Sequence, residues 1–176
     1  MTHFLYLRHF VCLTCFSALV GLTAHLPLAD DAPLSFALYG GLHAAALAMA
    51  VRAPQPLWRM AIFVGVAAAL SVVTLKAGLI ALQLLGNHLG NFRLYVALGF
   101  AAMIGALAYG ISIRQFKMQP LPPNALVLIS LGCTAAVYLG FFTLAHCHAL
   151  GRWWLAILWW FAFSAGLWFF GRPATD

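Results

Sequence analysis

Between Asp31 and Asp176 the sequence contains no acidic side chain, and this scarcity of charge constrains the fold more than any other feature. Charged residues make up 7% of the chain and hydrophobic residues 65%. A soluble domain carries roughly 25% charged residues, because its surface has to be hydrated. So few ions cannot cover a water-exposed globule. We therefore expect most of the surface to face hydrocarbon, as in an integral membrane protein.

Apolar runs long enough to cross a hydrocarbon core of about 30 Å recur along the chain. They predict an all-α fold, a polytopic transmembrane helical bundle of about six spans: Phe4–His25, Leu34–Val51, Trp58–Leu85, Phe92–Ile113, Ala125–Leu144 and Trp153–Phe170. Most of the breaks contain proline or glycine, which end helices. Because the loops are short, residues 1–176 are expected to form a single integral membrane domain.

The first apolar run is expected to be a membrane span and not a cleaved signal peptide. It is longer than the apolar region of a signal peptide, which covers roughly 7–15 residues, and Arg8 lies inside it. Cleavage is the alternative, and it would leave five helices with the same orientation.

The basic residues predict the orientation of these spans. With the N-terminus inside, the cytoplasmic ends carry six basic residues: Arg8, Arg52, Arg59, Arg114, Lys117 and Arg172. The opposite side carries only Arg93 and Arg152, together with Asp30 and Asp31. The positive-inside rule then places both termini in the cytoplasm (N-in/C-in) of a multi-pass protein of a cell membrane, most simply a bacterial inner membrane.

The same charges indicate which partners to expect. The basic residues are singletons between apolar runs, without the clusters that nucleic-acid binders show, so the lipid bilayer and not nucleic acid is the expected partner. Small residues recur every four positions, as at Gly40, Ala44 and Ala48 or at Ala102, Ala106 and Gly110. Such stripes let helices pack closely, either within the bundle or at a homodimer or partner-subunit face.

Several kinds of enzyme chemistry have no residues to use. A proton relay or acid–base pair built on intramembrane carboxylates is excluded, because the apolar runs contain none. The sequence also lacks a P-loop, a glycine-rich dinucleotide fingerprint, an HExxH motif and a nucleophile elbow. A non-enzymatic role is therefore favoured.

Four of the seven histidines fall at one predicted membrane face, the outer one: His25, His88, His146 and His148. Imidazole is a ligand of Zn²⁺ and copper, which commonly take three or four such groups. We expect a metal site here, with a transition-metal ion or haem as the cofactor. The alternative is that these histidines lie in the headgroup region without a ligand. His146 and His148 are two residues apart, so they do not share one helix face.

Three polar side chains fall within the predicted spans. His43 is mid-span, where an imidazole requires a hydrogen-bond partner, for which a Ser, Thr or Tyr of the bundle is expected. A role as haem ligand is the alternative. Lys76 and Gln83 are seven residues apart, hence on one helix face. They would suit an anionic substrate or a quinone oxygen, or Lys76 simply extends its ammonium to the interface.

A CxxC pair, Cys12 and Cys15, lies in the first span near the cytoplasmic side. Two thiols on one helix face serve as a redox pair or bind a soft metal, and the alternative is plain apolar packing. Together these features predict a small integral membrane transport or permease-like protein, with an outward-facing metal or cofactor site. The alternatives are a membrane redox or haem-binding subunit, and a non-catalytic accessory or assembly subunit of a membrane complex.

Overall fold

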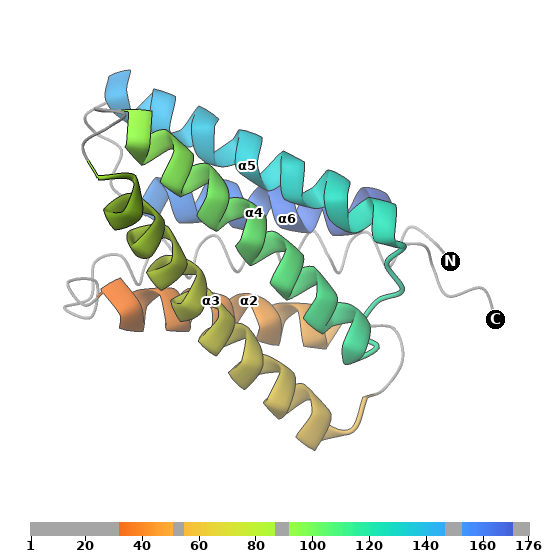
Figure 1. Cartoon of the computed structure of the whole chain (residues 1–176). Helices are drawn as coiled ribbons and strands as arrows, with labels where there is room; N and C mark the ends of the chain where they lie inside the picture. Colours follow the sequence, from red (N-terminus) through yellow and green to blue (C-terminus); the bar gives the residue numbers. More distant parts are fainter. Residues whose placement is uncertain (1–31, 51–54, 87–91, 147–152, 171–176) are drawn as a thin grey trace.

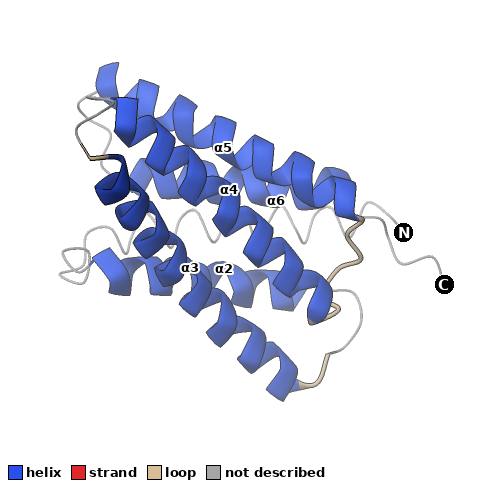
Figure 2. Ribbon diagram, viewed as in Figure 1, coloured by secondary structure: helices blue, strands red, loops and turns tan. Residues whose placement is uncertain are grey.

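The computed structural model describes residues 32–50, 55–86, 92–146 and 153–170, and all regular structure in these ranges is helical (Figure 2). The helices are α2 (Ala32–Ala50), α3 (Leu57–Leu85), α4 (Phe92–Gln115), α5 (Pro123–His146) and α6 (Trp153–Phe170). The last five predicted spans begin and end within two residues of these helices. The all-α fold is thus confirmed for these ranges. The expected span Phe4–His25 lies outside the described residues, so the total of six spans stays a prediction.

Three helices are long and apolar enough to cross a membrane: α3, α4 and the part of α5 from Pro123 to Thr143. Two further stretches, Pro33–Met49 and Ile157–Phe170, are shorter apolar helices. Large apolar side chains are exposed on the outside of the bundle, as expected for contact with hydrocarbon; Leu57, Leu84 and Phe169 are examples. The chain therefore has the properties of a membrane protein, and its orientation stays a prediction.

The helices form two layers (Figure 1). Each helix packs against the next one along the chain, from α2 to α6. The helices α3, α4 and α5 lie side by side in the front layer, with α2 and α6 behind them. Side chains from both layers meet between them in one apolar cluster, which includes Phe63, Tyr109, Ile113 and Phe163.

Small residues permit this close packing. Gly40, Ala44 and Ala48 are all buried on α2, and a Cβ at Gly40 would lie 2.8 Å from the carbonyl oxygen of Ala67 in α3. On α4 the second predicted stripe, Ala102, Ala106 and Gly110, is also buried. Both stripes therefore serve helix contacts within the bundle, where short side chains let backbones approach.

The C-terminal end of α4 has an unusual cap. The amide of Met118 donates to the carbonyl of Ile113, and the amide of Lys117 donates to the carbonyl of Arg114, each at 3.0 Å. This is the hydrogen-bond pattern of a Schellman motif, whose left-handed position is usually glycine. Here Lys117 occupies it, with a φ of 55°. A side chain in that conformation costs about 1 kcal/mol relative to glycine.

Candidate functional site: a buried histidine between three helices

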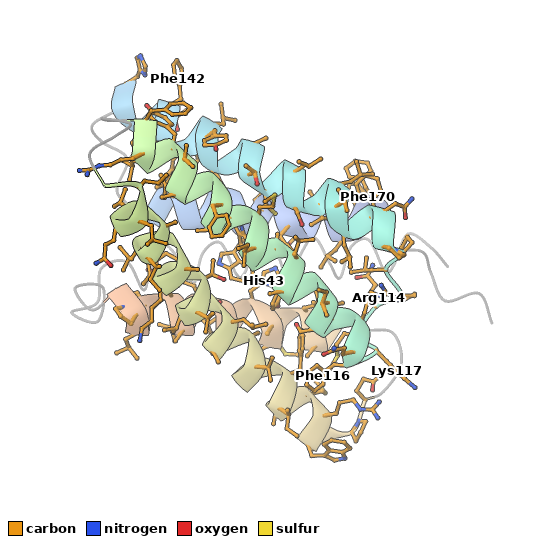
Figure 3. All side chains as sticks on the ribbon, in the orientation of Figure 1. His43, Arg114, Phe116, Lys117, Phe142 and Phe170 are labelled. Atoms are coloured by element: carbon orange, nitrogen blue, oxygen red, sulfur yellow. The ribbon has the colours of Figure 1, made fainter. Side chains whose placement is uncertain are left out.

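His43 is the polar centre of the bundle. It lies on α2, it is only 5% exposed, and Figure 3 shows it near the middle of the molecule, between the two layers. Its Nδ1 lies 3.0 Å from the hydroxyl of Tyr109 on α4. Its Nε2 lies 2.7 Å from the hydroxyl of Ser164 on α6. The hydrogen bond that the sequence led us to expect for this histidine is thus confirmed, and both ring nitrogens take part.

Both hydroxyls fit a neutral imidazole. A neutral ring has one N–H donor and one acceptor nitrogen, and a hydroxyl can act as either partner. Either tautomer of His43 can therefore satisfy Tyr109 and Ser164 at the same time. Among the described residues, every buried side-chain nitrogen or oxygen has a hydrogen-bond partner. The centre is a satisfied polar network inside an apolar bundle.

Aromatic rings enclose this network. The imidazole of His43 stacks on the indole of Trp160, with ring centres 4.3 Å apart and planes at 25°. Phe163 meets the imidazole edge-on at 6.1 Å. The ring of Tyr109 is stacked with Phe63 of α3 at 5.9 Å. Four helices thus contribute to the surroundings of one imidazole, and its ring orientation is fixed by stacking as well as by hydrogen bonds.

Two further polar contacts hold α6 in place beside the centre. The indole N–H of Trp159 donates to the backbone carbonyl of Ala102 on α4 at 3.2 Å. The thiol of Cys133 on α5 lies 3.8 Å from the backbone carbonyl of Trp159. These contacts fix the helix that carries Ser164 against both α4 and α5.

The arrangement favours neutral hydrogen-bonding chemistry. The centre contains an imidazole, a phenol and an alcohol, and the described part of the chain has no carboxylate side chain. Each of these groups can donate or accept a hydrogen bond without carrying a charge. In the arrangement that the structure shows, both ring nitrogens of His43 are hydrogen-bonded, so neither is available to an iron atom.

The structure tests little of the predicted outer metal site. His25, His88 and His148 lie outside the described residues, and so do Cys12 and Cys15. His146 ends α5 and is exposed, and its Nδ1 lies 2.8 Å from the carbonyl of Phe142 in the same helix. In the ranges that the structure describes, no group of three or more His, Cys, Asp or Glu side chains could hold a metal ion. The metal site stays a prediction.

Lys76 and Gln83 do not join the buried centre. Both side chains are exposed on α3, whereas His43 is buried between the layers. Their common exposure agrees with the seven-residue spacing that places them on one helix face. A role in binding a substrate stays a prediction for this pair.

Sequence reasoning did not identify Tyr109 and Ser164 by number. The available signal was weak, since hydroxyl residues occur in every predicted span, and many bond their own helix. Ser130 and Thr134 do so, each donating to the carbonyl four residues earlier. Comparisons with protein-family models, with curated proteins and with solved structures found no match for this chain. The function is therefore argued from the residues themselves.

Proposed function

We propose that the chain is a small multi-pass, permease-like protein that moves small uncharged polar solutes across the membrane through its buried histidine centre. The observation that carries the proposal is the bridge that His43 makes between Tyr109 and Ser164. An ionisable side chain inside a membrane bundle is costly to maintain, and residues of this kind mark substrate pathways among other functional sites.

The bridge has the properties of a closed gate. It joins α2 to α4 and α6, which are not consecutive along the chain, and it saturates every ring nitrogen of His43. Passage of a solute requires these side chains to separate, after which the solute's own donors and acceptors replace the lost hydrogen bonds. The lack of charge at the centre favours an uncharged solute over a cation or an anion.

Solute uptake by reconstituted vesicles tests the proposal. Purified protein is reconstituted into liposomes, and the recovery of vesicle volume in a glycerol or urea gradient is followed by stopped-flow light scattering. Recovery should be faster than in protein-free liposomes. Recovery at the protein-free rate with both solutes would overturn the proposal.

Two serine variants provide the matched comparison. Ser164→Ala removes one bond of the closed bridge, and a hydrogen bond between membrane helices contributes about 0.6 kcal/mol on average. Uptake should therefore rise about threefold. Ser130→Ala removes another buried hydroxyl, which bonds its own helix, so its uptake should equal that of the wild type. His43→Phe also removes the bridge, but it leaves the solute no ring nitrogen with which to replace the lost hydrogen bonds, so it should abolish uptake.

The alternatives have their own tests. A haem-binding subunit would show a Soret band in the purified protein, and His43 would have to lose its present hydrogen bonds to bind the iron. The outer metal site predicts that metal content falls in a His146→Ala, His148→Ala variant. An accessory subunit would need a docking face on α6, where Trp160 is buried and Phe161 is exposed. Loss of a co-purified partner on replacing Phe161 would favour that role.

A further inference from the structure

One end of the bundle gathers basic side chains from two helices. Arg114 lies in the last turn of α4 and Lys117 just beyond it, and both are exposed. Arg59 lies in the first turns of α3, one helical turn before Phe63. The rings of Phe63 and Phe116 are 5.7 Å apart, which brings the start of α3 next to the end of α4. Figure 3 shows Arg114, Phe116 and Lys117 at this end, opposite Phe142.

These cations have no carboxylate side chain to pair with inside the described part of the chain. The acidic residues of the sequence are Asp30, Asp31 and Asp176, and all of them lie outside it. Arg59 is oriented by neutral groups instead. Its guanidinium donates to the side-chain oxygen of Gln55 at 2.9 Å and lies 5.6 Å from the ring centre of Trp58. Within the described residues the positive charge is therefore not balanced by a carboxylate, and it can attract an external anion.

The backbone at Lys117 is a second, independent observation. This residue occupies the left-handed position of the Schellman motif at the end of α4, where glycine is the favoured residue. A side chain is retained there against the preference of the backbone. Strained backbone positions cluster at binding and active sites, so this one supports a binding role for the side chain. Lys117 lies three residues after Arg114, the last basic residue of the helix, and its amide donates to the Arg114 carbonyl.

Apolar and aromatic side chains surround the cations. Leu57 is 82% exposed and Trp58 61% exposed at the start of α3. Gln119 donates to the backbone carbonyl of Leu167 at 2.9 Å, so the end of α6 lies at the same end of the bundle. Trp168, which follows Leu167, is 46% exposed. Exposed indoles beside basic groups are typical of the level of lipid headgroups, with acyl chains adjacent.

We propose that Arg59, Arg114 and Lys117 form a binding site for the phosphate headgroup of an anionic phospholipid, with Trp58 and Leu57 against its acyl chains. The charge of the site favours an anion. The apolar side chains beside it favour a lipid over a free phosphate ion, which has no apolar part. The inference does not depend on the proposed transport function, because it uses different residues at the end of the bundle.

Electron paramagnetic resonance of spin-labelled lipids tests the site. The full chain is reconstituted in phosphatidylcholine vesicles, and the immobilised fraction of spin-labelled phosphatidylglycerol is compared with that of spin-labelled phosphatidylcholine. We expect selectivity for phosphatidylglycerol, weakening as salt is raised. Each removed charge in Arg114→Gln and Lys117→Gln should reduce this selectivity about fivefold. Lys76→Gln, which removes one exposed charge from the C-terminal third of α3, far from Arg59, is the matched control and should leave it unchanged.

A variant of Lys117 separates binding from folding. Lys117→Gly removes the charge and also relieves the backbone, so it should unfold at a higher denaturant concentration while its selectivity falls. Full selectivity in this variant, or an equal loss in Lys76→Gln, would overturn the site. Inorganic phosphate at constant ionic strength should not displace the labelled phosphatidylglycerol. Displacement by phosphate would show that the site takes the free ion and would overturn the assignment to lipid.

Discussion

Replacing His43 by phenylalanine keeps an aromatic ring on Trp160 and removes both ring nitrogens, so it isolates the hydrogen bonds of the centre. The phenol of Tyr109 is 2% exposed and would lose the partner that the structure shows for it. An unsatisfied buried hydroxyl costs about 1–3 kcal/mol. Ser164 can turn to a carbonyl of its own helix, so its loss is smaller, about 0.6 kcal/mol. The variant should be about 2–4 kcal/mol less stable than the wild type.

The double variant His43→Phe, Tyr109→Phe reverses most of this loss. It removes the stranded hydroxyl, and exchanging both partners of a buried hydrogen bond for apolar groups of similar shape is nearly neutral. It should therefore regain about 1–3 kcal/mol over His43→Phe alone.

The measurement is reversible unfolding in mixed micelles at increasing fractions of dodecyl sulfate, followed by far-ultraviolet circular dichroism. Tyr109→Phe alone completes the double-mutant cycle, which yields the coupling energy of the pair. A double variant less stable than His43→Phe would refute the reasoning, because the hydroxyl would then contribute through its ring contacts and not through the histidine. The stable double variant also allows the loss of solute uptake to be measured in a folded protein.

Three further predictions concern packing, access and orientation. Gly40→Ala should lower the unfolding free energy by about 1–3 kcal/mol, because the new Cβ would lie 2.8 Å from a carbonyl oxygen of α3. Gly65→Ala is the control, since its Cβ meets nothing within 4 Å, and it should be neutral or stabilising. Unfolding in mixed micelles measures both. A variant with Cys133 as its sole cysteine should react with a maleimide much more slowly before denaturation than after it, because this thiol is buried. Equal rates would contradict the packing of α5 on α6. With the four native cysteines replaced by serine, an impermeant maleimide should label Gln83→Cys but not Asn124→Cys in intact cells. The reverse pattern would invert the predicted topology.

The sequence predicts the helices well, for a physical reason. In a chain that faces hydrocarbon, the length of an apolar run and the prolines or glycines that end it determine each helix, and both are local properties. Pro122 and Pro123 illustrate this, since α5 begins at Pro123, where proline lacks an N–H that the first turn would not use. The small-residue stripes likewise predict close helix packing, because backbones approach only where side chains are small, whichever helix lies opposite.

The centre could be predicted only in part. A histidine in the middle of an apolar run needs a polar partner, so the kind of contact that His43 makes follows from its own chemistry. The partner's position depends on which helices converge, and this information is not local: Tyr109 is 66 residues away and Ser164 is 121. The rotation of α4 and α6 about their axes decides which hydroxyl faces inward. A helix that is apolar on all sides has no amphipathic pattern, so its sequence does not indicate which face points inward.

The separation of 121 residues between His43 and Ser164 also bears on how the protein is made. Neighbouring helices along the chain are neighbours in space, so each hairpin can pack as soon as its second helix is synthesised. The imidazole on α2, in contrast, cannot complete its bonds until α6 has left the ribosome and entered the bilayer. A nascent chain halted before that point carries an unsatisfied polar group in its core. Synthesis of α6 is thereby coupled to closure of the bundle.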